Sequence, residues 1–390
     1  MTRYPAGAAA TVAELETDPH PLLARLRASE PVSWLPALGG WLVTRHDLAL
    51  RVLRDAVTFT VDDPRFSTAQ VIGPSMLSLD GPAHTRHREP FARSFRPAGV
   101  RERFAEFATA EVDRLIAAVR PAGRAEVRQA IAGPLSVAVV AAALGLADAD
   151  AAVIRSWYHE FVEAISAITA GRHASPAAAA AFAGLRGGVL ATLRDGPAWS
   201  LLVAAAGGAR GGGLSAAEVV SNAAVLMFGG IDTTEGMITN AVGHLLGHPG
   251  ELKLVRGDPD LLGNAIEESA RLEPAAAVVD RYATTRVRLA GAAIERGDLV
   301  RVSIAGANRD PAVFAGPDRF DVRRENTRLH LAFARGPHFC FGAPLARLET
   351  RATLRGLLGQ LPGVRLDPAR PGAPRGLIFR KPPELHLRWD

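Results

Sequence analysis

The sequence has one cysteine, Cys340, and only two lysines, Lys253 and Lys381, among 390 residues. A single cysteine excludes an internal disulfide, which is typical of proteins from a reducing cytosol. With only two lysines, almost all of the 45 basic residues are arginines. The net charge of +5 therefore indicates coding bias more than an acidic binding partner. We expect no nucleic-acid partner.

Long apolar runs and a signal sequence are also missing. No run approaches the roughly 18 to 20 apolar residues of a membrane span. The first residues, MTRYPAG, lack the charged start and apolar stretch of a signal peptide. We expect a soluble, cytoplasmic protein without a membrane segment. Dinucleotide binding is not favoured either, because no G-x-G-x-x-G motif follows a strand and opens a helix.

The residues that are abundant indicate a packed globular protein. Hydrophobic residues make up 48% of the chain and charged residues 22%, and we expect residues 1–390 to form a single domain. From His84 to about Leu246 the apolar residues follow helical spacing almost throughout. Short β-like runs, among them VVDRYATT, VRLAG, DLVRVSIAG and PELHLRW, follow Arg271. The predicted fold class is mainly α (α+β), a helical domain with a small segregated sheet.

The first ninety residues mix element types. VSWLP and GWLVT flank Gly39 and Gly40, which predicts a small hairpin. Residues 60–80 show no sustained period and contain two prolines, which predicts a long loop. Loops of that length in compact domains are often binding elements.

Cys340 lies in a loop of glycine, proline, histidine and aromatic residues, HLAFARGPHFCFG, residues 330–342. A thiolate needs hydrogen-bond donors and positive potential, and the predicted helix that follows would supply both through its N-terminal amides. Gly336 and Gly342 permit backbone conformations that bring amides close to the sulfur. A lone cysteine is usually a small buried apolar residue, and the spacing fits no common zinc site. Each residue type in the loop has a physical reason to be there if Cys340 binds haem iron.

A long helix with an unfavourable centre is the second feature. Ser215 and Glu218 form a capping box, after which the helical pattern continues for about 50 Å. Its centre is FGGIDTTEGM, where Gly229 and Gly230 cost about 1 kcal/mol each relative to alanine. Taken alone, this segment fits a kinked core helix as well as a functional site.

With these motifs in place, the sequence resembles the cytochrome P450 superfamily. The haem loop of that family, F-x-x-G-x-[HR]-x-C-x-G, matches at its five fixed positions, Phe333, Gly336, His338, Cys340 and Gly342. The sequence departs from the bacterial form at Ala334, where glycine is common, and at Phe341, where an aliphatic residue is usual. GGIDT resembles the [AG]-G-x-[DE]-T motif of the helix that crosses the distal haem face. The resemblance covers essentially the whole chain.

The resemblance implies haem b as cofactor, with Cys340 as the metal ligand and Phe333, His338 and Gly342 around the ring. Gly230 would let the long helix approach the iron, and Asp232 and Thr233 would deliver protons and are the expected catalytic residues. Four residues are expected to hold the haem propionates: His84, Arg88, Arg281 and His338.

The resemblance also implies a scaffold and a substrate pocket. Glu268 and Arg271 match the family's E-x-x-R, which is structural, and Arg319 in the following meander is the expected third member. Taken alone, the pair would be an ordinary surface ion pair. The expected pocket residues are mostly apolar: Val71, Met76, Val225, Phe228, Gly229, Val278, Val279, Leu377 and Ile378.

The implied activity is that of a haem-thiolate monooxygenase that uses O2 to oxidise a small, largely apolar molecule, in secondary-metabolite biosynthesis. Electrons would come from a separate ferredoxin or flavodoxin with an NAD(P)H-dependent reductase, and a monomer is expected. Six arginines are candidates for docking that partner, unless they are solvated helix charges: Arg93, Arg96, Arg101, Arg103, Arg347 and Arg351. The alternatives are oxidative coupling or peroxide-driven oxidation without oxygen insertion and, more remotely, a non-catalytic haem-binding protein. No motif indicates the substrate.

Overall fold

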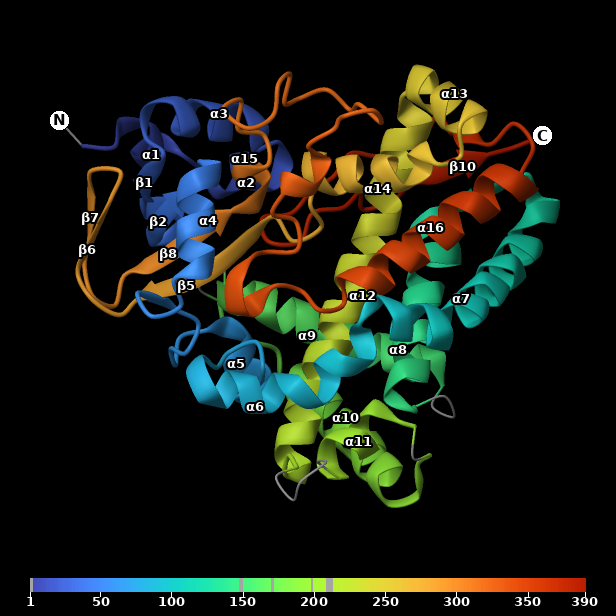
Figure 1. Ribbon diagram of the computed structural model, residues 1–390, viewed down its shortest axis with the longest axis horizontal. Coiled ribbons are helices and arrows are strands. Elements are labelled where there is room, and N and C mark those ends of the chain that lie inside the picture. Colours follow the sequence, from blue (N-terminus) through green and yellow to red (C-terminus); the bar gives the residue numbers. More distant parts are fainter. Residues whose placement is uncertain (1–2, 147–149, 170–171, 198, 208–212) are drawn as a thin grey trace.

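Figure 1 shows the computed structural model, which describes residues 3–146, 150–169, 172–197, 199–207 and 213–390. The α-helices are α1 (Pro5–Ala9), α2 (Val12–Thr17), α3 (His20–Ser29), α4 (His46–Arg54), α5 (Ser67–Ile72), α6 (Gly81–Ala92), α7 (Pro97–Val119), α8 (Gly133–Leu144), α9 (Ala151–Thr169), α10 (Pro176–Asp195), α11 (Leu201–Gly207), α12 (Ala216–Gly247), α13 (Pro249–Gly257), α14 (Leu261–Leu272), α15 (Ile304–Ala307) and α16 (Ala343–Gln360). The strands are β1 (Val32–Leu35), β2 (Gly40–Val43), β3 (Phe59–Thr60), β4 (Arg124–Glu126), β5 (Val278–Ala283), β6 (Val287–Leu289), β7 (Ala292–Ile294), β8 (Leu299–Ser303), β9 (Arg365–Leu366) and β10 (His386–Arg388). The mainly helical class with a small sheet region is confirmed.

The five-stranded sheet and the pair β6 and β7 lie on one side of the molecule, and β10 of the three-stranded sheet β4-β10-β9 lies on the other (Figure 1). The largest has the strand order β1-β2-β8-β5-β3, in which β2 and β8 run parallel and the other neighbours antiparallel. The predicted hairpin is confirmed as β1 and β2, with Val32 opposite Val43 and Gly39 at φ +58° in the turn. The β-like runs after Arg271 form β5, β6, β8 and β10 as predicted. The predicted loop over residues 60–80 is interrupted by α5, so that prediction was only partly right.

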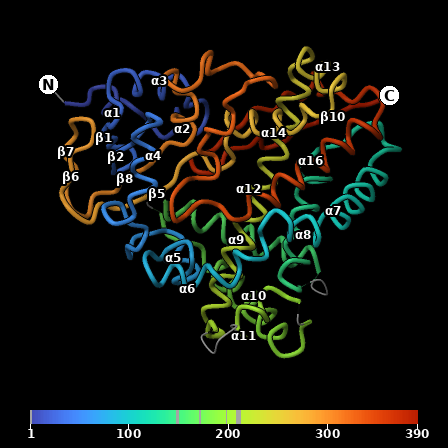
Figure 2. The backbone as a smooth tube through the Cα atoms, viewed as in Figure 1, coloured from blue at the N-terminus to red at the C-terminus, as the bar shows by residue number. Residues whose placement is uncertain are grey.

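The helical half is organised around α12, which Figure 2 shows crossing the molecule. The capping box that begins α12 is present, since Ser215 N donates to Glu218 Oε2 at 2.8 Å and Glu218 N donates to Ser215 Oγ at 3.4 Å. Ile231, Ile238 and Val242 of this helix are fully buried in the largest apolar core. Helix α16 packs against both α7 and α12, so the loop before α16 is brought to the middle of α12.

The sequence predicts no apolar segment long enough to span a membrane, and helix α10 departs from that prediction. It is long and apolar enough, by length and composition, to cross a membrane, and 28% of its apolar window is buried. One such helix is weak evidence, because core helices of soluble proteins pass the same test. Alanine supplies much of its apolar character, which explains why reading for runs of large apolar residues missed it.

Candidate active site

A cavity of about 350 Å³ lies between the middle of α12 and the loop that precedes α16. Gly229 and Thr233 of α12 line one wall, and Cys340 and Phe333 line another. Protein surrounds the Cys340 side chain on every side except the one that faces this cavity. The side chain is solvent accessible through that side. The two predicted motifs, about a hundred residues apart in sequence, are therefore brought to the same cavity.

The loop holds the thiol close to the first amides of α16. Cys340 N donates to Phe333 O at 2.9 Å, which closes the loop. Burial raises the pKa of the Cys340 thiol, and the N–H groups of Gly342 and Ala343 and the charge of Arg88 oppose this rise. The loop therefore presents hydrogen-bond donors to the sulfur, as an iron-bound thiolate requires.

Backbone conformation explains two of the loop positions. Gly336 has φ +76°, and a Cβ there would lie 2.4 Å from the carbonyl oxygen of Leu53. Ala334 has φ +55°, in the left-handed region that glycine occupies at little cost. This backbone conformation explains why glycine is usual at this position in the family. It also means that the backbone of Ala334 is strained.

Phe341, the other departure from the family pattern, has a packing role. Its ring contacts Phe95 with centroids 4.9 Å apart, and the guanidinium of Arg88 lies 4.9 Å from its centroid. An aromatic residue here joins the cysteine loop to the segment after α6, which an aliphatic side chain would do with less contact area.

The four predicted propionate anchors converge on one side of the cavity. Arg88, Arg281 and His338 line it, and the His84 ring lies 4.4 Å from that of His338. The Nε2 atom of His84 is buried and has no hydrogen-bond partner among the described residues. Burial, with the charges of His338 and Arg88, lowers the pKa of His84 to about 4. Burial also lowers the pKa of Arg281 to about 10. A buried site with one unpaired histidine nitrogen and two guanidinium groups fits the two carboxylates of a haem.

Asp80 is part of this group and was missed from sequence. It accepts hydrogen bonds from His338 Nε2 at 2.8 Å, Thr60 Oγ1 at 2.6 Å and Val61 N at 2.9 Å. Burial raises the pKa of Asp80, but these hydrogen bonds outweigh it and lower the pKa overall. The Asp80 carboxylate is therefore negatively charged, and it orients the ring of His338. The signal was weak, because an aspartate before a helix is usually read as a cap.

The two glycines in the middle of α12 have different surroundings. A Cβ at Gly229 would meet nothing within 4 Å, so this glycine faces open space. A Cβ at Gly230 would lie 2.8 Å from Val140 Cγ2, which means that Gly230 is required for packing against α8. Both residues line the cavity, and the packing of Gly230 against Val140 is a role that sequence reasoning did not predict. Thr233 donates from Oγ1 to Gly229 O at 2.5 Å, one turn earlier.

Asp232, the other predicted proton-relay residue, lies on a different side of α12 from the cavity. It is 3% exposed and accepts a hydrogen bond from Lys381 Nζ at 2.6 Å. Among the described residues, those that line the cavity include Thr233 and Thr234 but not Asp232. The structure thus brings Thr233 to the cavity and leaves the Asp232 carboxylate in an ion pair that sequence reasoning did not predict.

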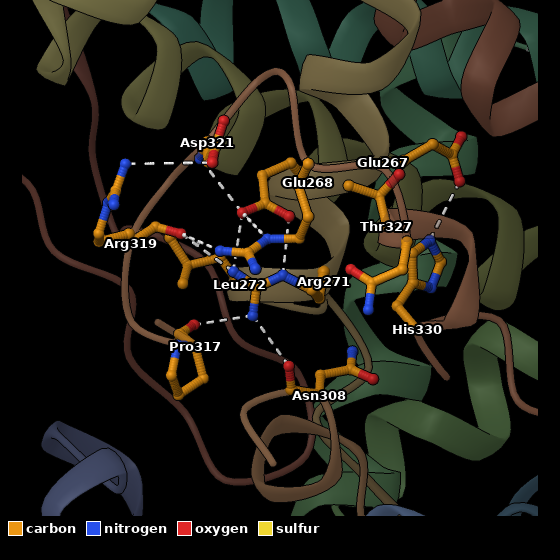
Figure 3. Close-up of polar contacts among 12 residues, drawn as sticks. Glu267, Glu268, Arg271, Leu272, Asn308, Pro317, Arg319, Asp321, Thr327 and His330 are labelled. Atoms are coloured by element: carbon orange, nitrogen blue, oxygen red, sulfur yellow. Dashed lines mark hydrogen bonds and ion pairs between the residues drawn. The ribbon is translucent and has the colours of Figure 1, made fainter. Parts of the chain in front are cut away.

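The E-x-x-R pair is a buried network, shown in Figure 3. Arg271 donates from Nε and Nη2 to the two carboxylate oxygens of Glu268 at 2.7 and 2.8 Å, and both side chains are fully buried. The third member is Arg324, whose Nε donates to Glu268 Oε1 at 2.9 Å. The prediction of Arg319 was wrong: its side chain is 77% exposed, and only its carbonyl oxygen accepts from Arg271. The meander has no regular period from which to choose between the two arginines.

A second ion-pair group ties this scaffold to the cysteine loop. Glu267 accepts hydrogen bonds from His330 Nε2 at 3.0 Å and from Arg347 Nε at 2.6 Å. The Arg347 guanidinium also lies 4.4 Å from the centroid of Phe333. Burial raises the pKa of Glu267, but hydrogen bonds from His330 and Arg347 outweigh it and lower the pKa to about 2. Arg347 therefore has an internal role that sequence reasoning did not predict.

Most predicted pocket residues line the cavity. They are Met76, Val225, Phe228, Gly229, Val278, Val279 and Ile378. Two predictions were wrong. Val71 packs against the helical core, and Leu377 packs against a separate cluster near Leu23. The apolar residues Phe66, Leu77 and Ile165 line the cavity and were missed, since they lie in segments without a motif.

The fold and this site define a protein that holds a haem through a cysteine thiolate, with a helix opposite the thiolate and an apolar cavity between. A bound haem would supply oxygen activation, a chemistry that thiolate ligation favours. A haem in this cavity would have its propionates held by His84, Arg88, Arg281 and His338, and its iron bound by the sulfur of Cys340.

Comparison with known proteins agrees with this assignment. A model of the family "Cytochrome P450" matches residues 198–361. The chain is 36% identical to cytochrome P450 monooxygenase PikC of Streptomyces venezuelae over 395 residues, covering 96% of this chain and 92% of PikC. It is 32% identical to 6-deoxyerythronolide B hydroxylase of Saccharopolyspora erythraea, covering 97% and 99% of the two chains. Among solved structures, P450BioI in complex with an acyl carrier protein superposes with a TM-score of 0.87 at 28% identity, covering 96% and 99%. The chain belongs to the cytochrome P450 family and is a cytochrome P450 monooxygenase.

Proposed function

We propose that the protein inserts oxygen from O2 into a small, largely apolar molecule, in a biosynthetic pathway for a secondary metabolite. The observation that carries this proposal is the cavity itself, where the Cys340 thiol and Thr233 face a space lined mainly by apolar residues. The relatives named above act on different molecules, so they support the reaction type more than a particular substrate. A panel of candidate ligands, scored by displacement of the iron-bound water in the optical spectrum, would identify the substrate class.

The proposed cofactor is haem b, held without covalent attachment. A covalently attached haem of the c type needs two cysteines, and this chain has one, which faces the cavity. Reduced protein with carbon monoxide should give the absorbance typical of thiolate-ligated haem, and Cys340→Ser should abolish it. A spectrum typical of histidine ligation in the unmodified protein would contradict this assignment.

The proposed proton path ends at Thr233, which lies on the cavity wall. Its hydroxyl is a donor to Gly229 O in this structure, and a hydroxyl can also hold and orient water for proton transfer. Thr233→Ala should divert reducing equivalents from product to hydrogen peroxide while leaving haem binding intact. Unchanged coupling between electron consumption and product would remove Thr233 from the path. Asp232 is proposed as the acid that supplies it.

A second candidate function, peroxide-driven oxidation, is favoured by the ion pair that keeps Asp232 off the cavity wall. A peroxide-driven enzyme would not depend on reductive proton delivery by this carboxylate. The two candidates are separated by supplying either hydrogen peroxide alone or O2 with a reductase and ferredoxin. Faster product formation with peroxide would favour the second candidate.

The proposed electron donor is a separate acidic protein, a ferredoxin or flavodoxin with its NAD(P)H-dependent reductase. Four of the six predicted docking arginines are exposed: Arg93, Arg96, Arg101 and Arg351. Arg103 donates to the Trp199 carbonyl oxygen, and Arg347 pairs with Glu267, so they are the weaker candidates. Charge reversal at the four exposed arginines should slow reduction and weaken its salt dependence.

The remaining proposals concern the whole protein. We propose that residues 1–390 form one domain, that it acts as a monomer, and that it works in the cytoplasm. The matches to whole relatives support the first proposal, and the single reduced cysteine supports the last. Sedimentation of the haem-loaded protein tests the monomer.

A further inference from the structure

A tight turn near the C-terminus forms part of the cavity wall. Ile378 and Phe379 of this turn line the cavity. The turn closes where Arg375 and Lys381 exchange backbone hydrogen bonds at 3.0 and 3.3 Å. Gly376 has φ +112°, and a Cβ there would collide with the carbonyl oxygen of Phe379. The backbone of this turn therefore decides where two apolar side chains meet a ligand.

The buried side chain of Arg380 holds the main chain of the turn. It is 3% exposed, and its Nη2 donates to Pro374 O at 3.0 Å and its Nη1 to Gly376 O at 2.8 Å. A guanidinium group is planar and offers its donors in fixed directions. These two bonds therefore fix the position of the turn relative to the Arg380 side chain.

The same guanidinium is anchored to two distant segments. Its Nε donates to Oε1 of Glu273, the residue that follows α14, at 2.7 Å. Glu273 Oε2 lies 2.9 Å from His20 Nε2. Burial raises the pKa of Glu273, but hydrogen bonds from His20 and Arg380 outweigh it and lower the pKa to about 2. Nη1 of Arg380 also donates to the carbonyl oxygens of Leu15 and Glu16 in α2, at 3.3 and 3.1 Å. Arg380 thus joins the turn to α2 and to the end of α14.

Main-chain bonds attach the turn independently of the Arg380 side chain. Ala277 N donates to Ile378 O at 2.7 Å, and Arg380 N donates to Ala275 O at 2.9 Å. These bonds remain when the guanidinium is removed, so we expect variants at Arg380 to fold with the turn in place. What such variants lose is the pair of bonds from the guanidinium into the turn.

We propose that Arg380 is a positioning residue that sets the shape of the substrate cavity through the turn that carries Ile378 and Phe379. The inference deepens the proposed function, because it rests on this cavity being the substrate site. Among the residues that the structure describes, neither Arg380 nor any residue of α2 lines the cavity. Helix α2 therefore takes part in shaping a site that it does not touch.

Two variants of Arg380 separate its geometry from its charge. Arg380→Met removes both. Arg380→Lys keeps a positive charge beside Glu273, but a single ammonium group does not reproduce the fork that reaches Pro374 O and Gly376 O together. We expect the two variants to behave alike.

Arg309→Met is the matched control. Arg309 is also largely buried, with 13% of its side chain exposed, and its Nη2 lies 3.8 Å from Glu273 Oε2. Its hydrogen bonds go to Leu272 O and to Asp318, so among the described residues it has none to the turn. This variant removes a guanidinium group beside the same carboxylate and leaves the turn as it is.

The first measurement is hydrogen exchange of the full-length, haem-loaded protein. The amide of Gly376 donates to Glu16 O at 2.8 Å, so its exchange reports how often the turn leaves α2. Exchange at this amide should become about tenfold faster or more in Arg380→Met and Arg380→Lys, because local opening requires fewer bonds to break. Arg309→Met should keep the wild-type rate. An unchanged rate in both Arg380 variants would overturn the inference.

The second measurement compares the binding of two imidazoles, followed in the haem spectrum. An imidazole nitrogen binds haem iron. Imidazole itself is small, whereas clotrimazole carries three aromatic rings that have to fit the cavity walls. Arg380→Met and Arg380→Lys should weaken clotrimazole binding by about tenfold, because the ligand then has to order the turn, and should leave imidazole binding within about twofold of the wild type. Arg309→Met should change neither.

The outcomes distinguish a positioning role from a structural one. Faster exchange with wild-type clotrimazole binding would make Arg380 purely structural. Equal weakening of both imidazoles, or the same loss in Arg309→Met, would show general damage, and each of these results would overturn the inference. If Arg380→Met does not load haem, Arg380→Lys decides. The proposed function fails separately: an enzyme that shows the selective loss of clotrimazole binding but inserts no oxygen into any candidate substrate would refute that function and leave the role of Arg380 intact.

Discussion

Replacement of Arg324 by alanine should destabilise the protein by about 3 to 5 kcal/mol, because it leaves the buried Glu268 with one counter-ion instead of two. The Arg324 side chain is 7% exposed and Glu268 is fully buried. Besides its bond to Glu268, Arg324 donates to the carbonyl oxygens of Ala315 at 2.6 Å and Gly316 at 3.1 Å. Alanine would therefore also leave carbonyl groups of the meander without donors.

Arg319→Ala is the matched control for this prediction. Arg319 lies five residues away in the same meander, its side chain is 77% exposed, and its nearest carboxylate, Asp321, is 4.0 Å away. Exposed pairs of this kind contribute about 0 to 1 kcal/mol. The main-chain carbonyl that Arg319 supplies to Arg271 is kept in the alanine variant.

The assay is urea unfolding of haem-loaded protein, followed by haem absorbance and by tryptophan fluorescence. For a chain of this length, the entropy of unfolding is on the order of 0.8 kcal/mol per degree. Arg324→Ala should therefore also lower the melting temperature by about 4 to 6 °C, and Arg319→Ala by about 1 °C or less. Equal destabilisation by the two variants, or a larger effect of Arg319→Ala, would refute the assignment of Arg324 as the third member.

Three further predictions follow from the cysteine loop and from α12. Ala334→Gly should stabilise the protein by about 0.5 to 1 kcal/mol, since relief of the left-handed strain exceeds the entropy cost of glycine; an unchanged urea midpoint would contradict the strain. Gly336→Ala should destabilise by at least about 2 kcal/mol because of the contact with Leu53 O, and haem loading at a raised temperature measures this. Burial lowers the pKa of His244 to about 4, below the roughly 6.5 of a histidine in an unfolded chain. The contribution of neutral His244 to the free energy of unfolding is therefore complete above about pH 6.5 and is lost as pH falls toward 4. Urea midpoints at pH 7.5 and pH 5 should differ less in His244→Asn than in the wild type, and an equal difference would exclude His244 as a cause.

The parts of the site that could be predicted from sequence are those in which one local pattern carries the chemistry. The capping box at Ser215 and the loop around Cys340 are of this kind, because the residues that act together are close in sequence. The hairpin at Gly39 follows the same logic. A turn or a cap is decided within a few residues, so its pattern is visible without knowledge of the fold.

The parts that could not be predicted depend on chain paths without a period. Lys381 meets Asp232 across 149 positions of sequence, and Asp80 meets His338 across 258. Arg319 and Arg324 lie in an irregular meander where only the path of the backbone decides which side chain turns inward. In each case the sequence supplies the charges, and the packing of distant segments selects the pairs.

The position of Cys340 makes the protein convenient for site-specific chemistry. Since the chain has no other cysteine and this one faces the cavity, coordination to haem iron should protect it from a thiol reagent. The fraction of protein that reacts with a maleimide would then count the molecules without haem. A cysteine introduced at an exposed surface position would be the sole reactive thiol of the loaded enzyme, so a dye or a spin label could be attached there while the native cysteine is kept.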